Sequence, residues 1–473
     1  MQPTQLGLIL IPLCLIYWQQ PNKLLVIALI AAIFEGGAAL LIGGFGLPTA
    51  TLPALLIMGF VVMQYALGMR YPGESVVLWA LLPLLAFAAY AVGSALLLPN
   101  AFEGKVIVWP QPTKDAVLYL ATPLRASAGN ITQTMYLLLN VAAAVTTALY
   151  VTRRDLNYQL FLKAYMVGGY LIFAISLWQF ASRVAGVPFP TSFFHSNTGF
   201  AIVEQNFGSI PRISGPFAEP AALAVYMSGV AFCSLWLCVR GHRVMWPQVS
   251  LITSTLTILL STSTTGIVTV VAGMPLTLCY AAVTGGGEGL QRTTRTLATL
   301  VVGSLLLLTP LLILKPEIID AVDKIAEITM SKQDGESYAE RTSWDLDAVQ
   351  ATVSTFGLGV GWGSFRSSSL IPGLLANGGV PGLFCLIWLA MNIYGLSGRA
   401  ARVVPEHPGQ AAIDGFRAAL IGQLAAAVLS APMIVSVGFF LQLGIVVGTA
   451  ARITLRSRRT NLMPIPMAAS FLR

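Results

Sequence analysis

Long apolar segments constrain this chain more than any other feature of its sequence. They recur as runs of about 17 to 25 residues between short polar breaks, and a helix needs roughly 20 such residues to cross a bilayer. Only 10% of the 473 residues are charged, against about a quarter in a soluble domain. The sequence therefore predicts an all-α, polytopic membrane protein with one integral membrane domain over residues 1–473.

We expect about 12 or 13 transmembrane helices. The predicted spans are 6–18, 24–44, 48–67, 76–98, 131–151, 160–181, 218–240, 245–262, 265–283, 296–314, 374–396, 412–431 and 433–451. A Ser/Thr-rich run at 261–266 marks a helix break between two of them. The polar breaks at 182–217 and 315–373 are predicted to be long loops that carry function.

The distribution of basic residues predicts the orientation of the chain in the membrane. With loops assigned alternately to the two sides, 17 of the 27 lysines and arginines lie on one side and 13 of the 19 acidic residues on the other. Cytoplasmic loops are enriched in lysine and arginine, so loops 182–217 and 315–373 are expected to face away from the cytoplasm. The net charge of +8 is a topology signal and gives no reason to expect nucleic-acid binding.

The 315–373 loop contains two predicted amphipathic helices. Apolar residues share one helical face in each, namely Ile318, Val322, Ile325 and Thr329 in the first, and Leu346, Val349, Val353 and Phe356 in the second. Such helices could lie at the membrane surface or pack against neighbouring helices, and the sequence leaves both possibilities open.

Two arginines in these loops are candidates for binding an anion. Arg212 and Arg341 each precede a predicted helix, and arginine offers a planar, permanently charged fork that suits phosphate oxygens. The start of a helix also attracts anions. Alternatively, the arginines pair with neighbouring Glu219, Glu340 or Asp345, or anchor to lipid headgroups.

Two other loop residues are candidate general bases. Glu219 directly precedes Pro220, a favourable first-turn residue, so it either caps the helix, acts as a base or orients Arg212. Efficient base catalysis would require burial to raise its pKa towards neutrality. His195 has a suitable intrinsic pKa, although a single loop histidine is commonly a surface residue.

The 315–373 loop also contains a glycine-rich segment. Glycines alternate four times between positions 357 and 363, and Arg366 follows. Glycine at this density lets a backbone approach a ligand closely or present its amides to an anion. The segment lacks the Gly-Lys-Ser/Thr of a nucleotide-binding loop, and a flexible connector is the alternative interpretation.

Two stretches together resemble the bacterial O-antigen ligase and polymerase superfamily, and especially its Wzy-type exopolysaccharide polymerases. Residues 212–224, with sequence RISGPFAEPAALA, are similar to the family's arginine-glycine-phenylalanine-x-(Asn/Glu)-Pro motif at the start of a span. Residues 341–382 resemble its second signature, an arginine, a tryptophan-bearing helix and a Gly-x-Gly-x-Gly-Ser-Phe segment. The similarity covers roughly residues 205–395.

The resemblance implies a membrane glycosyltransferase of the GT-C-like type. It would join polyprenyl-pyrophosphate-linked repeat units at the periplasmic face of the bacterial inner membrane, by inverting, metal-independent transfer without a cofactor. Arg212 and Arg341 would neutralise the pyrophosphate leaving group, with Glu219 as the first-choice base and His195 as the second. The expected substrate-binding residues are Arg366, Gly361, Gly363, Trp344 and Glu340. The implied partners are the lipid-linked glycan donor and acceptor, the lipid bilayer, and a chain-length regulator or export complex.

Two other functions remain as alternatives. Ligases of the superfamily carry a histidine before the following glycine segment, whereas residues 367–372 read SSSLIP, which argues against a ligase. A solute or polysaccharide transporter would place polar residues at the membrane midplane. Glu35 is the only acid expected well inside a span, and an intramembrane acid is a functional candidate.

Overall fold

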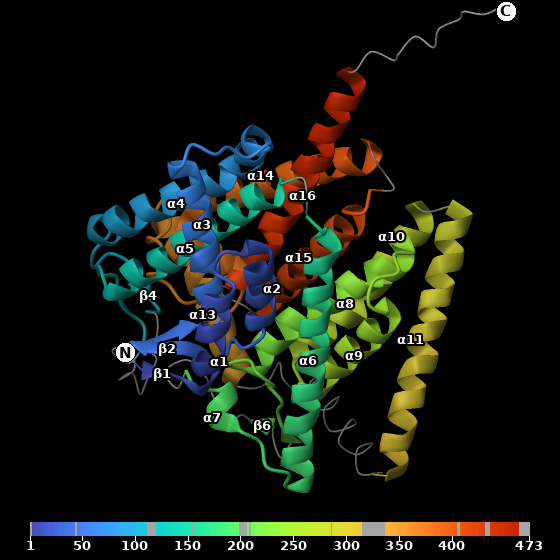
Figure 1. Cartoon of the computed structure of the whole chain (residues 1–473). Helices are drawn as coiled ribbons and strands as arrows, with labels where there is room; N and C mark the ends of the chain where they lie inside the picture. Colours follow the sequence, from blue (N-terminus) through green and yellow to red (C-terminus); the bar gives the residue numbers. More distant parts are fainter. Residues whose placement is uncertain are drawn as a thin grey trace, which may run out of the picture.

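The computed structural model describes residues 2–42, 45–110, 120–153, 156–197, 206–207, 210–284, 286–314, 336–403, 407–430 and 436–462. Over these residues the protein is a bundle of α-helices with three small sheets (Figure 1). Eight of the described helices are long and apolar enough to cross a membrane. They are α4 (Glu74–Ala101), α5 (Ala128–Val151), α6 (Tyr158–Ala185), α8 (Pro220–Arg240), α10 (Thr264–Thr284), α14 (Leu370–Val403), α15 (Gln410–Ser430) and α16 (Val437–Leu462). The predicted all-α, polytopic membrane fold is confirmed.

Other described helices are shorter or more polar. The short apolar ones are α1 (Gln5–Ile16), α2 (Pro21–Ala31), α3 (Thr51–Ala66) and α9 (Pro247–Leu260). The remainder are α7 (Thr191–Phe194), α11 (Gly286–Leu314) and α13 (Glu336–Ser354). Every predicted span overlaps one helix, and the predicted break at 261–266 separates α9 from α10. The amphipathic helix predicted around Ile318–Thr329 lies outside the described residues.

The strands are short and antiparallel. One sheet has the order β1-β2-β3, and two strand pairs are β4-β5 and β6-β7. Their bounds are β1 (Gln2–Pro3), β2 (Ala38–Ile42), β3 (Phe45–Pro48), β4 (Ile107–Val108), β5 (Thr122–Pro123), β6 (Asn206–Phe207) and β7 (Ile210–Pro211).

Residues 24–44 do not form the single span that was predicted. Helix α2 ends at Ala31, and strand β2 follows after a turn. Gly36 and Gly37 lie in that turn, and glycine weakens a helix by about 1 kcal/mol. A β-carbon at Gly36 would lie 3.1 Å from the backbone of Phe217, so the turn is also required by tertiary packing. An apolar run does not by itself distinguish a buried strand from a helix, which explains the wrong prediction.

Small residues let the central helices approach closely. A β-carbon added at Gly422 of α15 would lie 2.7 Å from the carbonyl oxygen of Ser228 in α8. A β-carbon added at Gly448 of α16 would lie 2.4 Å from the carbonyl oxygen of Ala148 in α5. Close approach at small residues is typical of helix packing in membranes. Of the most apolar 18-residue stretch of each helix, 83% is buried in α8 and 22% in α10. Helix α10 lies with α11 at the edge of the bundle (Figure 1).

Charged groups from separate parts of the chain come together in the fold. At one end of the bundle, Asp414 lies 2.9 Å from Nε2 of His242 and 3.5 Å from Nε of Arg240. Arg292 donates to the carbonyl of Arg240 there. Arg240, His242 and Arg292 belong to the breaks predicted to be cytoplasmic, and Asp414 lies near the start of the predicted span 412–431. The other end carries α7, the segment before α8, and α13, and we call it the loop end.

Candidate functional site

Helix α8 begins where the sequence predicts, with Glu219 as its N-cap and Pro220 in its first turn. Glu219 has an extended backbone, and its carbonyl accepts from the N–H of Leu223. Its side chain makes no capping hydrogen bond and is exposed. The capping role considered for Glu219 therefore involves only its backbone, and its carboxylate is free to act on neighbouring groups.

A glutamine of α6 holds the segment before α8. The side-chain oxygen of Gln179 accepts from the backbone N–H of Ser214 at 3.0 Å and of Gly215 at 2.7 Å. Gly215 has φ +55°, and a β-carbon there would lie 2.7 Å from Oγ of Ser176. The glycine of the first motif is thus needed for the backbone conformation and for the close approach to α6.

His195 packs beneath this segment. Its side chain is only 2% exposed, and Nε2 lies 3.0 Å from the carbonyl oxygen of Phe217. Burial lowers the pKa of His195, although its contacts with the carbonyls of Phe217 and Gly215 oppose that change. The ring is therefore neutral near pH 7, and it is buried where a surface position was expected. This geometry indicates that His195 positions the segment before α8.

The turn after α2 brings Glu35 to the same segment. The N–H of Gly36 donates to the carbonyl of Pro216 at 3.0 Å, and the carbonyl of Gly36 accepts from Asn197 at 3.2 Å. Glu35 therefore lies in a turn outside the helices and not within a span as predicted. Its Oε2 atom is buried and has no hydrogen-bond partner among the described residues.

The charges of Glu219 and Arg341 act on two groups at this point, Glu35 and Arg212. Burial raises the pKa of Glu35 to about 7, and the negative charge of Glu219 contributes to the increase. Burial also lowers the pKa of Arg212, the positive charge of Arg341 lowers it further, and Glu219 opposes both effects. We call Glu35, Arg212, Glu219 and Arg341 the charged cluster. The fold thus assembles two carboxylates and two guanidinium groups from three separate parts of the chain.

Helix α13 supplies Arg341. Its residue Asp345 attaches the helix to the start of α14. Asp345 accepts from the backbone N–H groups of Ser368 and Ser369 at 2.8 and 3.1 Å and from the hydroxyl of Ser369 at 2.6 Å. The carboxylate of Asp345 is thus engaged with the start of α14. Glu340 and Arg341 both lie on the exposed surface of α13.

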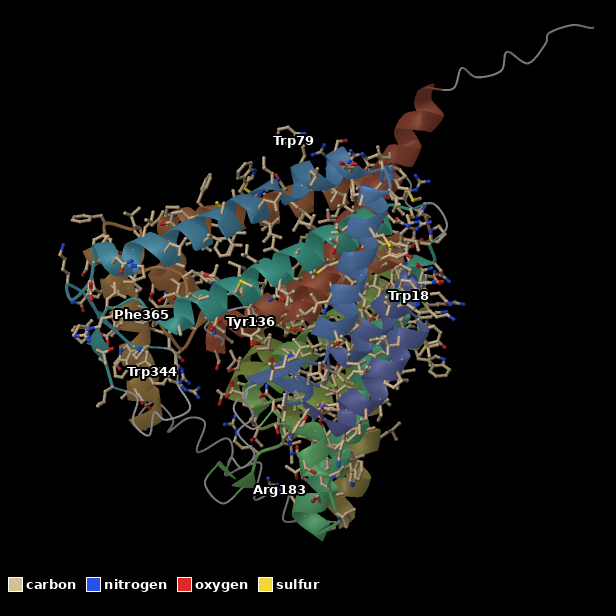
Figure 2. The ribbon with its side chains drawn as sticks, turned by 60° about the vertical axis from the view of Figure 1, so that its left-hand side comes forward. Trp18, Trp79, Tyr136, Arg183, Trp344 and Phe365 are labelled. Carbon is tan, nitrogen blue, oxygen red and sulfur yellow. The ribbon has the colours of Figure 1, made fainter. Side chains whose placement is uncertain are left out.

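Trp344 and Arg366 form a stacked group beside this contact. The guanidinium carbon of Arg366 lies 5.0 Å from the centre of the Trp344 ring, and the ring of Trp109 lies 5.8 Å from Trp344. The N–H of Arg366 donates to the carbonyl of Trp109 at 2.8 Å. Trp344 and the nearby Phe365 lie on the same side of the molecule (Figure 2). Two of the five predicted substrate-binding residues, Trp344 and Arg366, are therefore held in one small aromatic group.

The glycine-rich segment is ordered by its contacts with the bundle. Gly361 has φ +99°, and a β-carbon there would lie 2.7 Å from the carbonyl oxygen of Ser94. Gly363 has φ +85°, and its β-carbon would lie 2.9 Å from the carbonyl oxygen of Gly129. Both glycines are buried. Packing accounts for glycine at these positions, and a contact with substrate remains a prediction.

Two buried asparagines fix the same segment. Asn377 of α14 accepts from the N–H groups of Gly363 and Phe365 and donates to the carbonyl of Phe365. Asn130 of α5 donates to the carbonyl of Trp362 and to the hydroxyl of Ser364. These anchors hold the backbone that leads to Arg366.

Several of these residues were not identified from the sequence. Gln179 lies inside the predicted span 160–181 and Asn130 directly precedes the predicted span 131–151, and a polar residue at such a position does not reveal its partner. Glu35 gave a partial signal as an isolated acid followed by two glycines. Its neighbours come from positions far along the chain, so the sequence did not connect it with Glu219.

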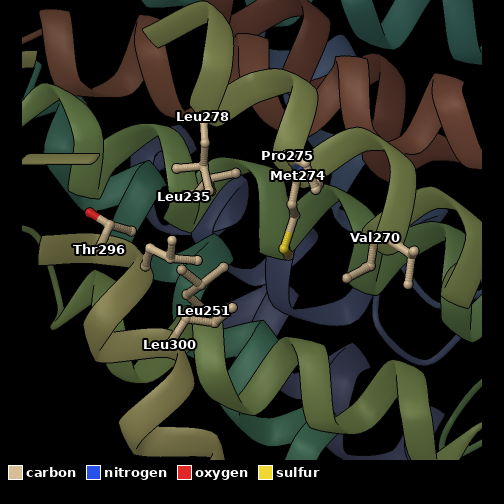
Figure 3. Close-up of a pocket in the computed structure, with 10 residues that line it drawn as sticks. Leu235, Leu251, Val270, Met274, Pro275, Leu278, Thr296 and Leu300 are labelled. Atoms are coloured by element: carbon tan, nitrogen blue, oxygen red, sulfur yellow. The ribbon is translucent and has the colours of Figure 1, made fainter. Parts of the chain in front are cut away.

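A separate apolar cavity lies between α8, α9, α10 and α11 (Figure 3). Its volume is about 210 Å³, and its lining includes Leu235, Leu251, Met274 and Leu300. Leu235 follows Glu219 by some four helical turns, which is roughly 24 Å along α8. The cavity is therefore distinct from the charged cluster.

Within the described residues, no group of three or more His, Cys, Asp or Glu side chains is arranged to hold a metal ion. In comparisons with known proteins, no family model matches the chain, and no curated protein matches it.

Proposed function

We propose that the protein is a membrane glycosyltransferase that joins polyprenyl-pyrophosphate-linked oligosaccharide repeat units into an exopolysaccharide. The observation that carries this proposal is that Arg212 and Arg341 belong to different loops and yet lie close enough for the charge of Arg341 to add to the effect of burial in lowering the pKa of Arg212. Two nearby guanidinium groups repel each other unless an anion lies between them. A pyrophosphate supplies such an anion and suits the arginine fork.

In the proposed reaction, an acceptor sugar hydroxyl attacks the anomeric carbon of the donor. The bond between that carbon and the pyrophosphate oxygen breaks, and the anomeric configuration inverts. Negative charge develops on the departing lipid pyrophosphate, and Arg212 and Arg341 stabilise it more strongly in the transition state than in the bound donor. The reaction needs positioned positive charge at the leaving group, which these two side chains supply.

The hydroxyl proton passes to the carboxylate pair. Glu35 has a pKa of about 7, and a general base works best when its pKa lies near the operating pH. Burial raises that pKa and the charge of Glu219 adds to the increase, so we assign to the two glutamates together the role of base that was expected of Glu219. His195 supports the segment that carries Arg212 and does not enter the chemistry.

The proposed setting follows from the charge distribution along the chain. The loop end faces the periplasm, and the opposite end, which carries Arg240 and Arg292, faces the cytoplasm of a bacterial inner membrane. The lipid-linked donor and acceptor approach from the bilayer. A chain-length regulator and an export complex are the remaining proposed partners.

A reconstituted polymerisation assay tests the proposal. The purified full chain in nanodiscs is mixed with polyprenyl-pyrophosphate repeat units and a chelator, and the products are sized by gel and mass spectrometry. We expect a ladder spaced by one repeat, abolished in Arg212→Ala and in Arg341→Ala. Arg70→Ala is the control, since Arg70 pairs with Glu74 at the other end of the bundle and should leave the ladder unchanged.

Two results would contradict the proposal. One is a normal ladder from both arginine variants of the charged cluster. The other is unchanged substrate with wild-type protein when a known polymerase extends the same material, and this would favour the ligase or the transporter.

A further inference from the structure

Helix α13 packs against the protein through one face and leaves a second, apolar face uncovered. The packed face contains Trp344, Ala348 and Ala351, and Thr355 continues it just past the end of the helix; each is at most 8% exposed. The outward face contains Leu346 at 65% exposed, Val349 at 43% and Val353 at 71%. The sequence alone allowed this apolar face to pack against neighbouring helices, but the fold points it outward.

Phe356 extends the outward face beyond the end of the helix. Its side chain is 87% exposed, and its backbone has φ +54°. A residue that ends a helix in this left-handed conformation is usually glycine or asparagine, and a bulky residue there is an outlier. A strained backbone under an exposed aromatic ring indicates that the ring itself has a role.

The outward face of α13 continues into the exposed side of α14. A β-carbon at Gly357 would lie 3.4 Å from Cγ2 of Val380, and the N–H of Val380 donates to the carbonyl of Gly357 at 2.8 Å. From there, side chains at least 53% exposed recur along α14 at helical spacing: Val380, Phe384, Ile387, Met391 and Tyr394. Since α14 is long and apolar enough to span a membrane, this stripe is a lipid-facing surface.

We propose that Leu346, Val349, Val353 and Phe356 insert into the boundary between phospholipid headgroups and acyl chains, so that α13 is a membrane-surface helix. Continuity with the lipid-facing stripe of α14 selects the bilayer as the occupant. Polar Gln350 and Ser354 are exposed beside the apolar face, as in helices that lie in the interface with their apolar side buried.

The proposal has a consequence for the charged cluster. Arg341 lies on the same helix, nearer its start, so the insertion fixes this guanidinium group at the level of the lipid headgroups. A lipid-linked phosphate group reaches the protein at that level. The insertion of α13 does not depend on the proposed function, because any membrane protein with this surface would show it.

Spin labels on α13 test the insertion directly. The five native cysteines are replaced by alanine, because Cys279 is exposed and would take up label. Single cysteines are then introduced at Val349, Val353 and Ser354 in the full chain, labelled, and reconstituted in phospholipid nanodiscs. Collision rates with oxygen, which concentrates in lipid, and with a water-soluble nickel chelate are measured by electron paramagnetic resonance.

We expect an oxygen-to-nickel ratio several-fold higher at Val349→Cys and Val353→Cys than at Ser354→Cys, which lies on the polar side of the same turns. Equal ratios at the three positions would overturn the proposal. Labels at the two valine positions that are immobile and shielded from both reagents would also overturn it, because a protein surface would then cover the face. Using two valine positions keeps the test decisive if one variant does not fold.

Discussion

The negative charge of Glu219 raises the pKa of Glu35 beyond the effect of burial, although one residue follows α2 and the other begins α8. A nearby negative charge disfavours ionisation of a carboxylate, so a buried glutamate beside it keeps its proton to a higher pH. This relationship makes Glu35 the group of the charged cluster whose behaviour depends most directly on pH.

The first prediction concerns the pH dependence of stability. The pKa of Glu35 is about 7 in the folded protein against 4.5 in the reference state, so its contribution to stability is complete below the lower value and is lost as pH rises through the higher one. Glu35→Gln removes this loss. We expect the variant to be more stable than wild type at about pH 8, by on the order of 2 kcal/mol, and similar to it below pH 4.5.

Melting temperatures in detergent across this pH range check the Glu35 prediction. Glu219→Gln is the matched control, because it removes only the contribution of the neighbouring charge. In this variant the loss of stability should still begin near pH 4.5 but should be smaller and complete at a lower pH than in wild type. A Glu35→Gln variant that melts with the same pH profile as wild type would contradict the prediction.

The second prediction separates packing from catalysis at His195. Loss of the buried ring and of its contact with Phe217 should destabilise His195→Ala by about 2 kcal/mol. His195→Asn retains a donor for the Phe217 carbonyl and should recover part of the melting temperature and most of any activity. If His195 were the base, the asparagine variant would be stable but inactive, and measuring both properties on the same preparations distinguishes the two roles.

The third prediction concerns the glycine-rich segment. Gly361→Ala forces a β-carbon to within 2.7 Å of the carbonyl oxygen of Ser94 at a φ of +99°, and it should lower stability by more than about 1 kcal/mol. Gly59→Ala is the control, since Gly59 is a helical position with nothing within 4 Å of the added carbon. We expect that control to match or exceed wild type in thermal melts. Equal melting of the two variants would show that the segment tolerates side chains.

The fourth prediction concerns the asparagine that holds the same segment. Asn377 is fully buried, and its removal leaves the N–H groups of Gly363 and Phe365 unsatisfied, at a cost of about 2 kcal/mol or more. Asn377→Ala should therefore melt well below wild type. Asn392 also lies on α14, but its side chain makes only long hydrogen bonds, of 3.3 and 3.5 Å, to carbonyl groups of α4. Asn392→Ala should therefore change stability little. Thermal melts of the two alanine variants measure this difference, and equal melting temperatures would contradict the prediction.

Much of the helical framework was predictable because its cause is local. A helix satisfies its own backbone hydrogen bonds, so a bilayer-length apolar run is sufficient to specify one, and every predicted span overlaps a helix. The start of α8 was equally local, since Pro220 favours a first helical turn. The alternation of glycines from 357 to 363 marked an unusual backbone, and all four have positive φ.

The sequence by itself determined the membrane class, the positions of the helices and the two arginine-bearing loops. Only the tertiary structure decided that residues 24–44 turn and form a strand, that His195 is buried, that the charge of Glu219 acts on the buried Glu35, and that the apolar face of α13 points outward. The physical reason is the range of the interactions involved. Helix formation depends on neighbours within a few residues, whereas burial and electrostatic shifts depend on which distant segments pack together.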